Sequence, residues 1–105
     1  MMTKAVIVKD DYIVFSDSVP IFHSDETMIM DAVLMAFIKT QKIDIIHGWV
    51  FCNEAPSMAT AQAIIAAELS KVVYQNEELN EEQQAAIDLM EQYNIVVVHN
   101  PNILL

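Results

Sequence analysis

Residues 55–74 read APSMATAQAIIAAELSKVVY, and this stretch decides the architecture that we expect for the chain. Pro56 and Ser57 precede a run rich in Ala and Ile, which is typical of a helix that packs closely against a sheet. The stretch ends in the short, β-rich run 71–74. It therefore predicts a helix that is followed at once by a buried strand.

Similar signals extend in both directions along the chain. Asp10 and Asp11 form a turn-favouring pair between two β-rich runs, which predicts a hairpin. Gly48, the only glycine, marks a bulge or a close backbone approach, and Asn80 with Gln83 predicts a capping box at the start of the last helix. The expected elements are strands at 4–9 and 12–15, a helix at 25–42, a strand at 43–52, a helix at 57–70, a strand at 72–74, a helix at 81–93 and a strand at 95–99.

This order places helical crossovers between the last three strands, which therefore run parallel. Right-handed crossovers in one direction put both helices on the same face of the sheet. The strands are nevertheless apolar on both sides, as the runs 5–8 and 95–98 show, whereas an alternating pattern would leave one face polar. With the helices mainly on one face, the other face has no cover within 105 residues. We therefore expect a homodimer that forms through the uncovered face.

The composition limits the classes of function. The chain has 105 residues and a formal net charge of −10, and 54% of its residues are hydrophobic, which predicts one domain over residues 1–105. All five basic residues are Lys, and the lack of Arg opposes nucleic-acid binding. No apolar run approaches the ~20 residues of a membrane span, and no leader peptide is visible. Cys52 is the only cysteine, so we expect a cytoplasmic protein without disulfide bonds or membrane contact.

Residues 55–65, together with 71–74, resemble the second zinc motif of the cytidine and deoxycytidylate deaminase superfamily. In that family a Pro-Cys-x-x-Cys sequence opens an Ala/Ile-rich helix, and a Lys/Arg-Val-Val-Tyr strand follows. Counted back from Tyr74, the two metal cysteines fall on Ser57 and Thr60. The resemblance implies a cytidine deaminase-like α/β sandwich with a five-stranded mixed sheet in the order 2-1-3-4-5. Such families usually also have an N-terminal helix, and we expect it to be absent because the first strand begins by residue 4.

The family's first motif, His-x-Glu, belongs near the start of the first helix. Matching residues 31–33 to the family's helix puts the metal His on Thr27 and the proton-transferring Glu on Ile29. A shifted register would instead place His23 and Asp25 on the same spacing, with Asp in place of Glu.

These replacements bear on the chemistry that the resemblance implies. In zinc deaminases a His and two Cys hold the ion, while an unligated Glu transfers protons to and from the attacking water. The hydroxyls of Ser57 and Thr60 stay protonated near neutral pH and bind zinc poorly. We therefore expect no zinc, no other cofactor and no zinc-dependent deaminase activity.

Four residues on or just after the third strand lie near the mouth expected for the deaminase pocket. Cys52, Glu54 and His47 could supply a thiol nucleophile with acid/base groups, although no triad spacing is visible. They could equally be a small apolar Cys, an exposed loop Glu and a strand His. Trp49, on one strand face with Phe51, could stack on a base, or it could pack in a core or an interface.

A second group of polar residues lies around the first helix. His23, Asp25, Glu26 and Asp31 could bind a divalent cation, although no spacing matches a known ligand pattern. The alternative is that the acidic residues stabilise the positive end of the helix.

Three functions remain open from the sequence. The one that we favour is a non-catalytic, zinc-free deaminase-like protein that acts as a self-associating scaffold or binding module. The second is a sensor or regulator that keeps a nucleoside or nucleotide pocket, although a net charge of −10 without Arg opposes phosphate recognition. The third is an enzyme that uses metal-free chemistry through Cys52 or His47. The sequence names no small-molecule ligand.

Overall fold

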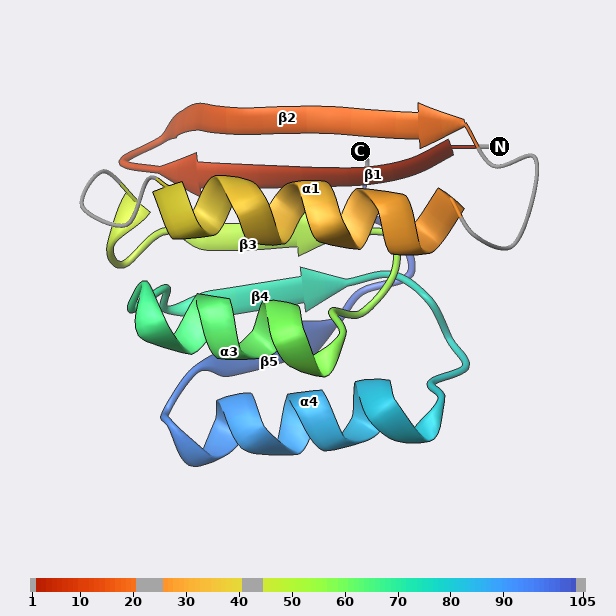
Figure 1. Cartoon of the computed structure of the whole chain (residues 1–105). Coiled ribbons are helices and arrows are strands. Elements are labelled where there is room, and N and C mark those ends of the chain that lie inside the picture. Colours follow the sequence, from red (N-terminus) through yellow and green to blue (C-terminus); the bar gives the residue numbers. More distant parts are fainter. Residues whose placement is uncertain (1, 21–25, 41–44, 104–105) are drawn as a thin grey trace.

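The computed structural model describes residues 2–20, 26–40 and 45–103 of the chain. The elements follow the predicted order of strands and helices (Figure 1). Their bounds are β1 Met2–Lys9, β2 Tyr12–Pro20, α1 Glu26–Thr40, β3 Trp49–Cys52, α3 Met58–Ala66, β4 Lys71–Tyr74, α4 Glu81–Gln92 and β5 Val96–His99. None of the described helices is long and apolar enough to cross a bilayer.

The strands form a five-stranded sheet in the order β2-β1-β3-β4-β5. β1 pairs antiparallel with both β2 and β3, whereas β3, β4 and β5 run parallel. Parallel neighbours need a crossover connection, which α3 and α4 supply. The predicted mixed sheet with the order 2-1-3-4-5 is confirmed.

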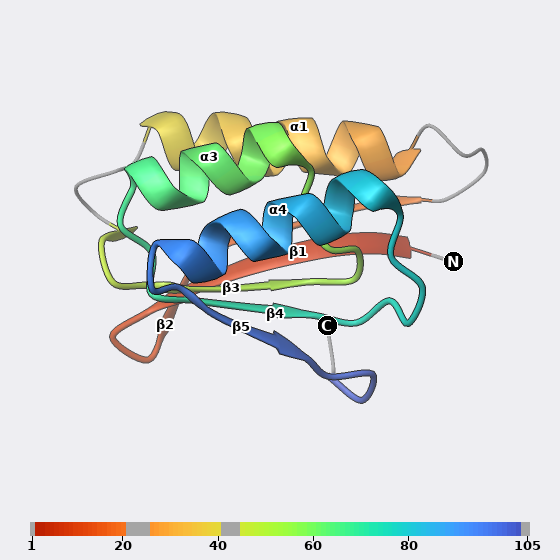
Figure 2. The same ribbon diagram turned by 90° about the horizontal axis from the view of Figure 1, so that it is seen from below.

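The helices cover a single face of this sheet. Figure 2 shows α1, α3 and α4 side by side on one side of the strands, and no described helix on the other. The core lies between the two layers, where the side chains of Ile7, Val50 and Val72 on the sheet and of Ile64 and Met90 on the helices are fully buried. The prediction that the helices lie on one face is therefore confirmed, and one face of the sheet is left without a layer from the described residues.

Three expected boundaries are wrong by several residues. The second strand continues to Pro20 rather than ending at residue 15, because it pairs with β1 along its whole length. Tight turns explain the other two. The third strand begins at Trp49 rather than at residue 43, because the Gly48 amide donates to the Ile45 carbonyl at 2.8 Å and His47 has a φ of 66°. Residues 43 and 44 lie outside the described ranges. The following helix ends at Ala66 rather than at residue 70, because Glu68 adopts a φ of 57° and thereby turns the next side chain into the core.

The glycine and the capping box behave as predicted. A Cβ on Gly48 would lie 2.8 Å from the Ile45 carbonyl oxygen, which explains why only glycine allows this close backbone approach. At α4 the Gln83 amide donates to Asn80 Oδ1 at 2.7 Å, and the Asn80 amide donates to Gln83 Oε1 at 3.1 Å. The Gln83 side chain also donates to the Ala55 carbonyl at 3.0 Å, so the cap ties α4 to the segment that leads into α3.

Candidate functional site

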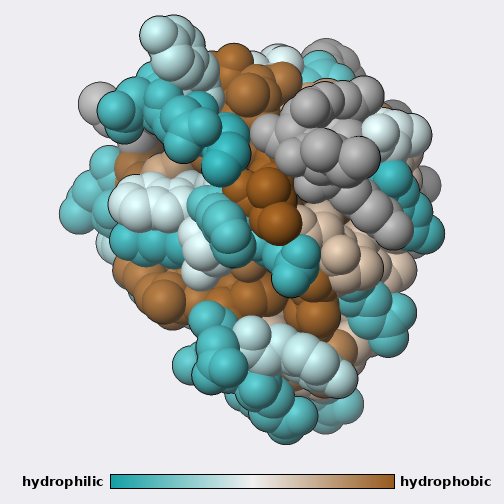
Figure 3. Space-filling model, turned by 90° about the vertical axis from the view of Figure 1, so that its left-hand side faces the viewer, coloured by the Kyte–Doolittle hydropathy of each residue, from teal (hydrophilic) through white to brown (hydrophobic). Residues whose placement is uncertain are grey.

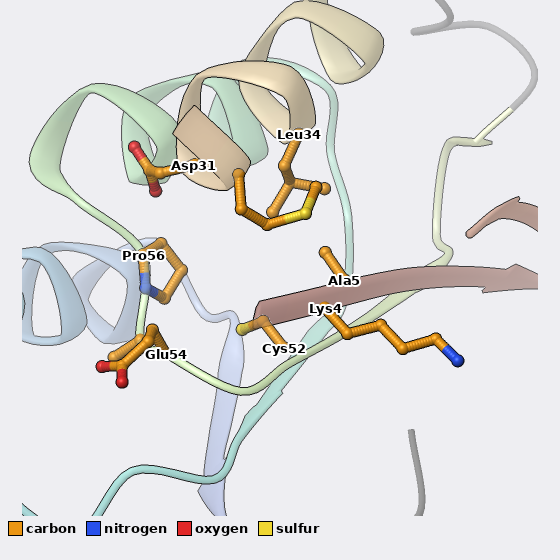
Figure 4. Close-up of a pocket in the computed structure, with 9 residues that line it drawn as sticks. Lys4, Ala5, Asp31, Leu34, Cys52, Glu54 and Pro56 are labelled. Atoms are coloured by element: carbon orange, nitrogen blue, oxygen red, sulfur yellow. The ribbon is translucent and has the colours of Figure 1, made fainter. Parts of the chain in front are cut away.

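The residues on which the resemblance places the second zinc motif lie at the start of α3, which faces α1 beyond the end of β3 (Figure 4). Ser57 is the N-cap of α3, with an extended backbone, and its hydroxyl accepts a hydrogen bond from the Thr60 amide at 3.3 Å. The two hydroxyl oxygens lie 3.4 Å apart, and Thr60 is completely buried. The structure therefore brings together Ser57 and Thr60, the two positions on which the resemblance places the metal cysteines.

Both hydroxyls donate to one residue of α1. The Ser57 hydroxyl donates to Asp31 Oδ2 at 2.5 Å, and the Ser57 amide donates to Asp31 Oδ1 at 3.1 Å. The Thr60 hydroxyl donates to the Asp31 backbone carbonyl at 3.3 Å. We call this set of contacts between Asp31, Ser57 and Thr60 the Asp31 clasp. It joins α1 to α3 through hydrogen bonds, of which those to the carboxylate are charge-assisted.

Backbone amides at the start of α3 donate hydrogen bonds to carboxylates of the chain itself. The first-turn N–H groups of a helix lack helical partners and favour anions. Here the Ser57 amide binds Asp31 from α1, and the Met58 amide donates to Glu82 of α4 at 3.2 Å. Two carboxylates from neighbouring helices therefore take the position that an anionic ligand would otherwise occupy.

The positions that match the first motif lie in the first two turns of α1. Thr27 belongs to the first turn of this helix. The Ile29 side chain is 51% exposed and is not among the residues that line the cavity beside the clasp. The position expected for the proton-transferring carboxylate therefore carries a solvent-exposed hydrocarbon. His23 and Asp25, from the alternative register and the predicted cation cluster, lie outside the described residues.

A small cavity lies next to the clasp. Its volume is about 30 Å³, and Asp31, Cys52, Glu54 and Pro56 are among its walls (Figure 4). This space suits a water molecule, whereas clefts for drug-sized ligands measure roughly 300 to 1,000 Å³. Lys4 also borders the cavity, but its ammonium points away from both carboxylates. The cavity is therefore too small for a nucleobase in this conformation.

Cys52 is not poised for nucleophilic chemistry. Its thiol is buried and contacts the Val73 carbonyl at 3.6 Å. Burial raises the pKa of this thiol from 9.0 to about 12, and the carboxylates of Asp31 and Glu54 add to the shift. The thiol stays protonated near neutral pH, whereas the thiolate is the reactive form.

The four pocket residues predicted around β3 fall on three different surfaces. Cys52 and Glu54 share the small cavity. Trp49 is 45% exposed on the helix-free face of the sheet, with the Lys71 ammonium 4.3 Å from its ring centroid. His47 borders a groove of about 320 Å³ at the opposite end of β3, near Tyr93. Figure 3 views this end of the molecule, where apolar patches alternate with hydrophilic groups.

Asp31 is the residue of this candidate site whose contacts the sequence did not reveal. The sequence suggests it only as a cation ligand, whereas in the structure its carboxylate accepts hydrogen bonds from Ser57 and joins α1 to α3. A signal was present, because Asp31 alone interrupts the apolar run from Met28 to Ile38. A single carboxylate in such an apolar run is expected to have a hydrogen-bond donor beside it, because burial of an unpaired charge is costly.

The donor set does not fit the zinc ion that the deaminase resemblance implies. Zinc in proteins is held by thiolate, imidazole or carboxylate groups. The two matching positions on α3 carry hydroxyls, and both already donate hydrogen bonds within the Asp31 clasp. Among the residues that the structure describes, no three His, Cys, Asp or Glu side chains lie together as a metal-binding group.

Comparisons with known proteins support the fold. No protein-family profile and no curated protein sequence matches the chain. Among solved structures, the apo dCMP deaminase of cyanophage S-TIM5 matches with a TM-score of 0.62 and 20% identity, over 93% of this chain and 79% of that one. The same enzyme in complex with dCMP and dUMP matches with a TM-score of 0.65 and 21% identity, over 93% and 80% of the two chains.

A bifunctional protein gives a further match. The diaminohydroxyphosphoribosylaminopyrimidine deaminase/5-amino-6-(5-phosphoribosylamino)uracil reductase of Thermotoga maritima matches with a TM-score of 0.70 and 16% identity. The match covers 92% of this chain but only 29% of that protein. Together these structures confirm the predicted cytidine deaminase-like α/β fold.

Proposed function

We propose that this deaminase-fold chain is a non-catalytic, zinc-free protein that acts as a self-associating scaffold or binding module. The observation that carries the proposal is the Asp31 clasp. At the positions where the resemblance puts two metal cysteines, Ser57 and Thr60 donate their hydroxyls to Asp31. The clasp provides a connection between α1 and α3 that needs no ion.

Two further features argue against deamination. Zinc-dependent deamination needs a carboxylate that transfers protons beside the attacking water. The corresponding position, Ile29, has a hydrocarbon side chain that is 51% exposed. A metal-free route through Cys52 is opposed by burial and by a thiol pKa of about 12, and His47 borders a different groove.

The cavity volume favours the scaffold over the sensor. A nucleoside sensor needs a cleft that can enclose a base, and the cavity beside the clasp measures about 30 Å³. The anion-binding end of α3 is also blocked, because Asp31 and Glu82 occupy its amides. A nucleotide would have to displace both carboxylates.

Self-association is supported by the sheet. One face packs against the helices, and the other is lined largely by apolar side chains without a covering layer from the described residues. Trp49 and Val96 on this face are 45% and 55% exposed. Contiguous apolar patches of this kind mark interaction sites in soluble proteins.

Three measurements on purified protein test the proposal. We expect no stoichiometric zinc in elemental analysis, no ammonia release from cytosine-containing nucleosides or nucleotides, and no saturable thermal shift with these compounds. Light scattering across a concentration series is expected to report a dimer. An active zinc-dependent dCMP deaminase serves as the positive control. Stoichiometric zinc or deamination would overturn the non-catalytic assignment, saturable stabilisation would favour the sensor, and a monomer at every concentration would refute self-association.

A further inference from the structure

Two rows of side chains cross the helix-free face of the sheet. Because side chains alternate along a strand, the residues between those of the core point to this face. Strand pairing aligns the first row as Val6, Phe51, Val73 and Val98, and the second as Val8, Trp49, Lys71 and Val96. Seven of these eight residues are apolar, and Lys71 lies with its ammonium over the Trp49 ring. These two rows are therefore almost entirely hydrocarbon and aromatic.

The side chains on this face differ in how far they are exposed to solvent. Val6 and Val73 are only 8% and 4% exposed, so they form a low floor between larger neighbours. Beside them, a groove of about 310 Å³ is bordered by Val8, Ile13, Phe51 and Ile103, among others. Trp49 stands next to this groove, with its ring centroid 6.3 Å from that of Phe51. One face therefore carries both a half-exposed aromatic side chain and a largely apolar groove, whose walls also include Lys4 and Ser16.

This combination suits a second copy of the same chain. A two-fold interface joins identical patches, so each patch must contain both the protruding part and the part that receives it. An axis that passes between Trp49 and the groove places each Trp49 over the groove of its partner. Stacked sheets pack about 10 Å apart, a distance that large side chains bridge.

The available area and the charge distribution agree with this occupant. A body of 34 × 26 × 24 Å with 6191 Å² of surface offers on the order of 1,000 Å² per side, which exceeds the ~800 Å² that a standard interface takes from each partner. In the described strands, the residues that point to this face include Lys4 and Lys71 but no Asp or Glu. Two chains of net charge −10 can therefore meet here with their carboxylates outside the contact.

We propose that two copies pack with their helix-free faces together about a two-fold axis, and that Trp49 of each copy fills the groove of the other. The inference rests on the proposed self-association and adds its geometry and its anchor residue. Tryptophan is enriched among the residues that dominate binding energy, especially in desolvated pockets near the centre of an interface. Lys71 lies at the start of β4, so its ammonium can reach solvent at the end of the sheet while its stem covers the ring.

Fluorescence provides a direct test, because Trp49 is the only tryptophan in the chain. Light scattering and tryptophan emission are recorded on the same dilution series. As the dimer forms, we expect the emission maximum to move to shorter wavelength and acrylamide quenching to fall by at least about twofold. Trp49→Ala is expected to weaken dimerisation by about 30-fold or more, which corresponds to the ~2 kcal/mol that defines a hot spot.

Matched variants distinguish the loss of the Trp49 contact at the interface from a general loss of folding. Ile13→Asp changes an exposed groove residue on the hairpin, and we expect it to weaken the dimer about as much as Trp49→Ala does. Tyr93→Ala removes another exposed aromatic residue, at the end of α4 on the helix side, and is expected to leave the dimer unchanged. Circular dichroism verifies that each variant is folded.

The outcomes distinguish this inference from the proposed function. A dimer whose Trp49 stays as quenchable as in the monomer overturns the anchor and leaves self-association intact. A monomer throughout the series overturns both. Burial of Trp49 on addition of a single-stranded oligonucleotide, without a dimer, overturns the inference in favour of nucleic-acid binding.

Discussion

Asp31 on α1 accepts two hydrogen bonds from Ser57 at the start of α3, one from the hydroxyl at 2.5 Å and one from the amide at 3.1 Å. The two residues are 26 positions apart in the chain, so the pair joins two helices that are distant in sequence. The resemblance places a metal ion at this meeting point.

Replacement of Asp31 by Ala is expected to lower the free energy of unfolding by about 2 kcal/mol, because hydrogen bonds to a charged partner contribute roughly 1.5 to 3 kcal/mol. Urea denaturation followed by circular dichroism measures this change. Glu91→Ala, an exposed acidic position on α4, serves as the matched control and is expected to stay within about 0.5 kcal/mol of the wild type. Equal stabilities of the two variants would show that the clasp contributes nothing.

The thiol of Cys52 is expected to resist modification in the folded protein. A pKa raised from 9.0 to about 12 lowers the thiolate fraction near neutral pH by about 1000-fold, and burial also hinders access. A colorimetric thiol reagent should react slowly with native protein and rapidly, with one equivalent, in denaturant. Fast labelling of the native chain would contradict the buried position.

The same pKa shift predicts how stability changes at alkaline pH. The unfolded thiol loses its proton near pH 9.0 and the folded thiol near 12, so deprotonation favours the unfolded state between these values. Stability should be unaffected by this group below pH 9 and should fall by up to about 1.4 kcal/mol per pH unit above it. Cys52→Ala removes the effect, so the difference between the two pH profiles isolates it from the titration of Lys and Tyr.

Restoration of the ligand set should restore metal uptake. In the variant Thr27→His/Ser57→Cys/Thr60→Cys, one imidazole and two thiolates replace three hydroxyls, which is the donor set of a zinc deaminase. We expect about one zinc per chain by elemental analysis, and still no deamination, because Ile29 offers no carboxylate. A folded variant that takes up no zinc would show that the assumed correspondence with the zinc motifs is wrong.

Salt is expected to strengthen self-association. Two chains of net charge −10 repel each other, and added salt screens this repulsion, with a Debye length of about 10 Å at 0.1 M. The dimer dissociation constant should therefore fall several-fold between 20 and about 300 mM sodium chloride in sedimentation experiments. Binding to a polyanion would show the opposite trend, because salt weakens such complexes.

Local signals predicted most of the fold. The turn at Asp10 and Asp11, the capping box at Asn80 and the single glycine each specify a conformation within a few residues, and the structure has all three. The composition of residues 43–52 is typical of one continuous strand. The left-handed backbone of His47 interrupts it, so β3 begins only at Trp49.

The site was harder to predict because it depends on distant contacts. Ser57 and Thr60 are one helical turn apart, so their proximity follows from the sequence, whereas their shared partner Asp31 becomes a neighbour only when α1 packs on α3. Trp49 and Cys52 are close in sequence, but strand alternation sends their side chains to opposite faces of the sheet. The alternation of side chains along a strand therefore already separates Trp49 from Cys52 at the level of the sequence.

The left-handed backbone described at His47 and Glu68 recurs in the hairpin turn and at Asn94, with φ values between 53° and 67°. Within the ranges that the structure describes, five residues other than glycine adopt this conformation, at turns that precede strands. Branched residues such as Val or Ile fit poorly there, whereas Gly, Asn and Asp are accepted. A saturation mutagenesis library selected for foldability should therefore be depleted of β-branched residues at these solvent-facing turns, which are otherwise expected to tolerate almost any change.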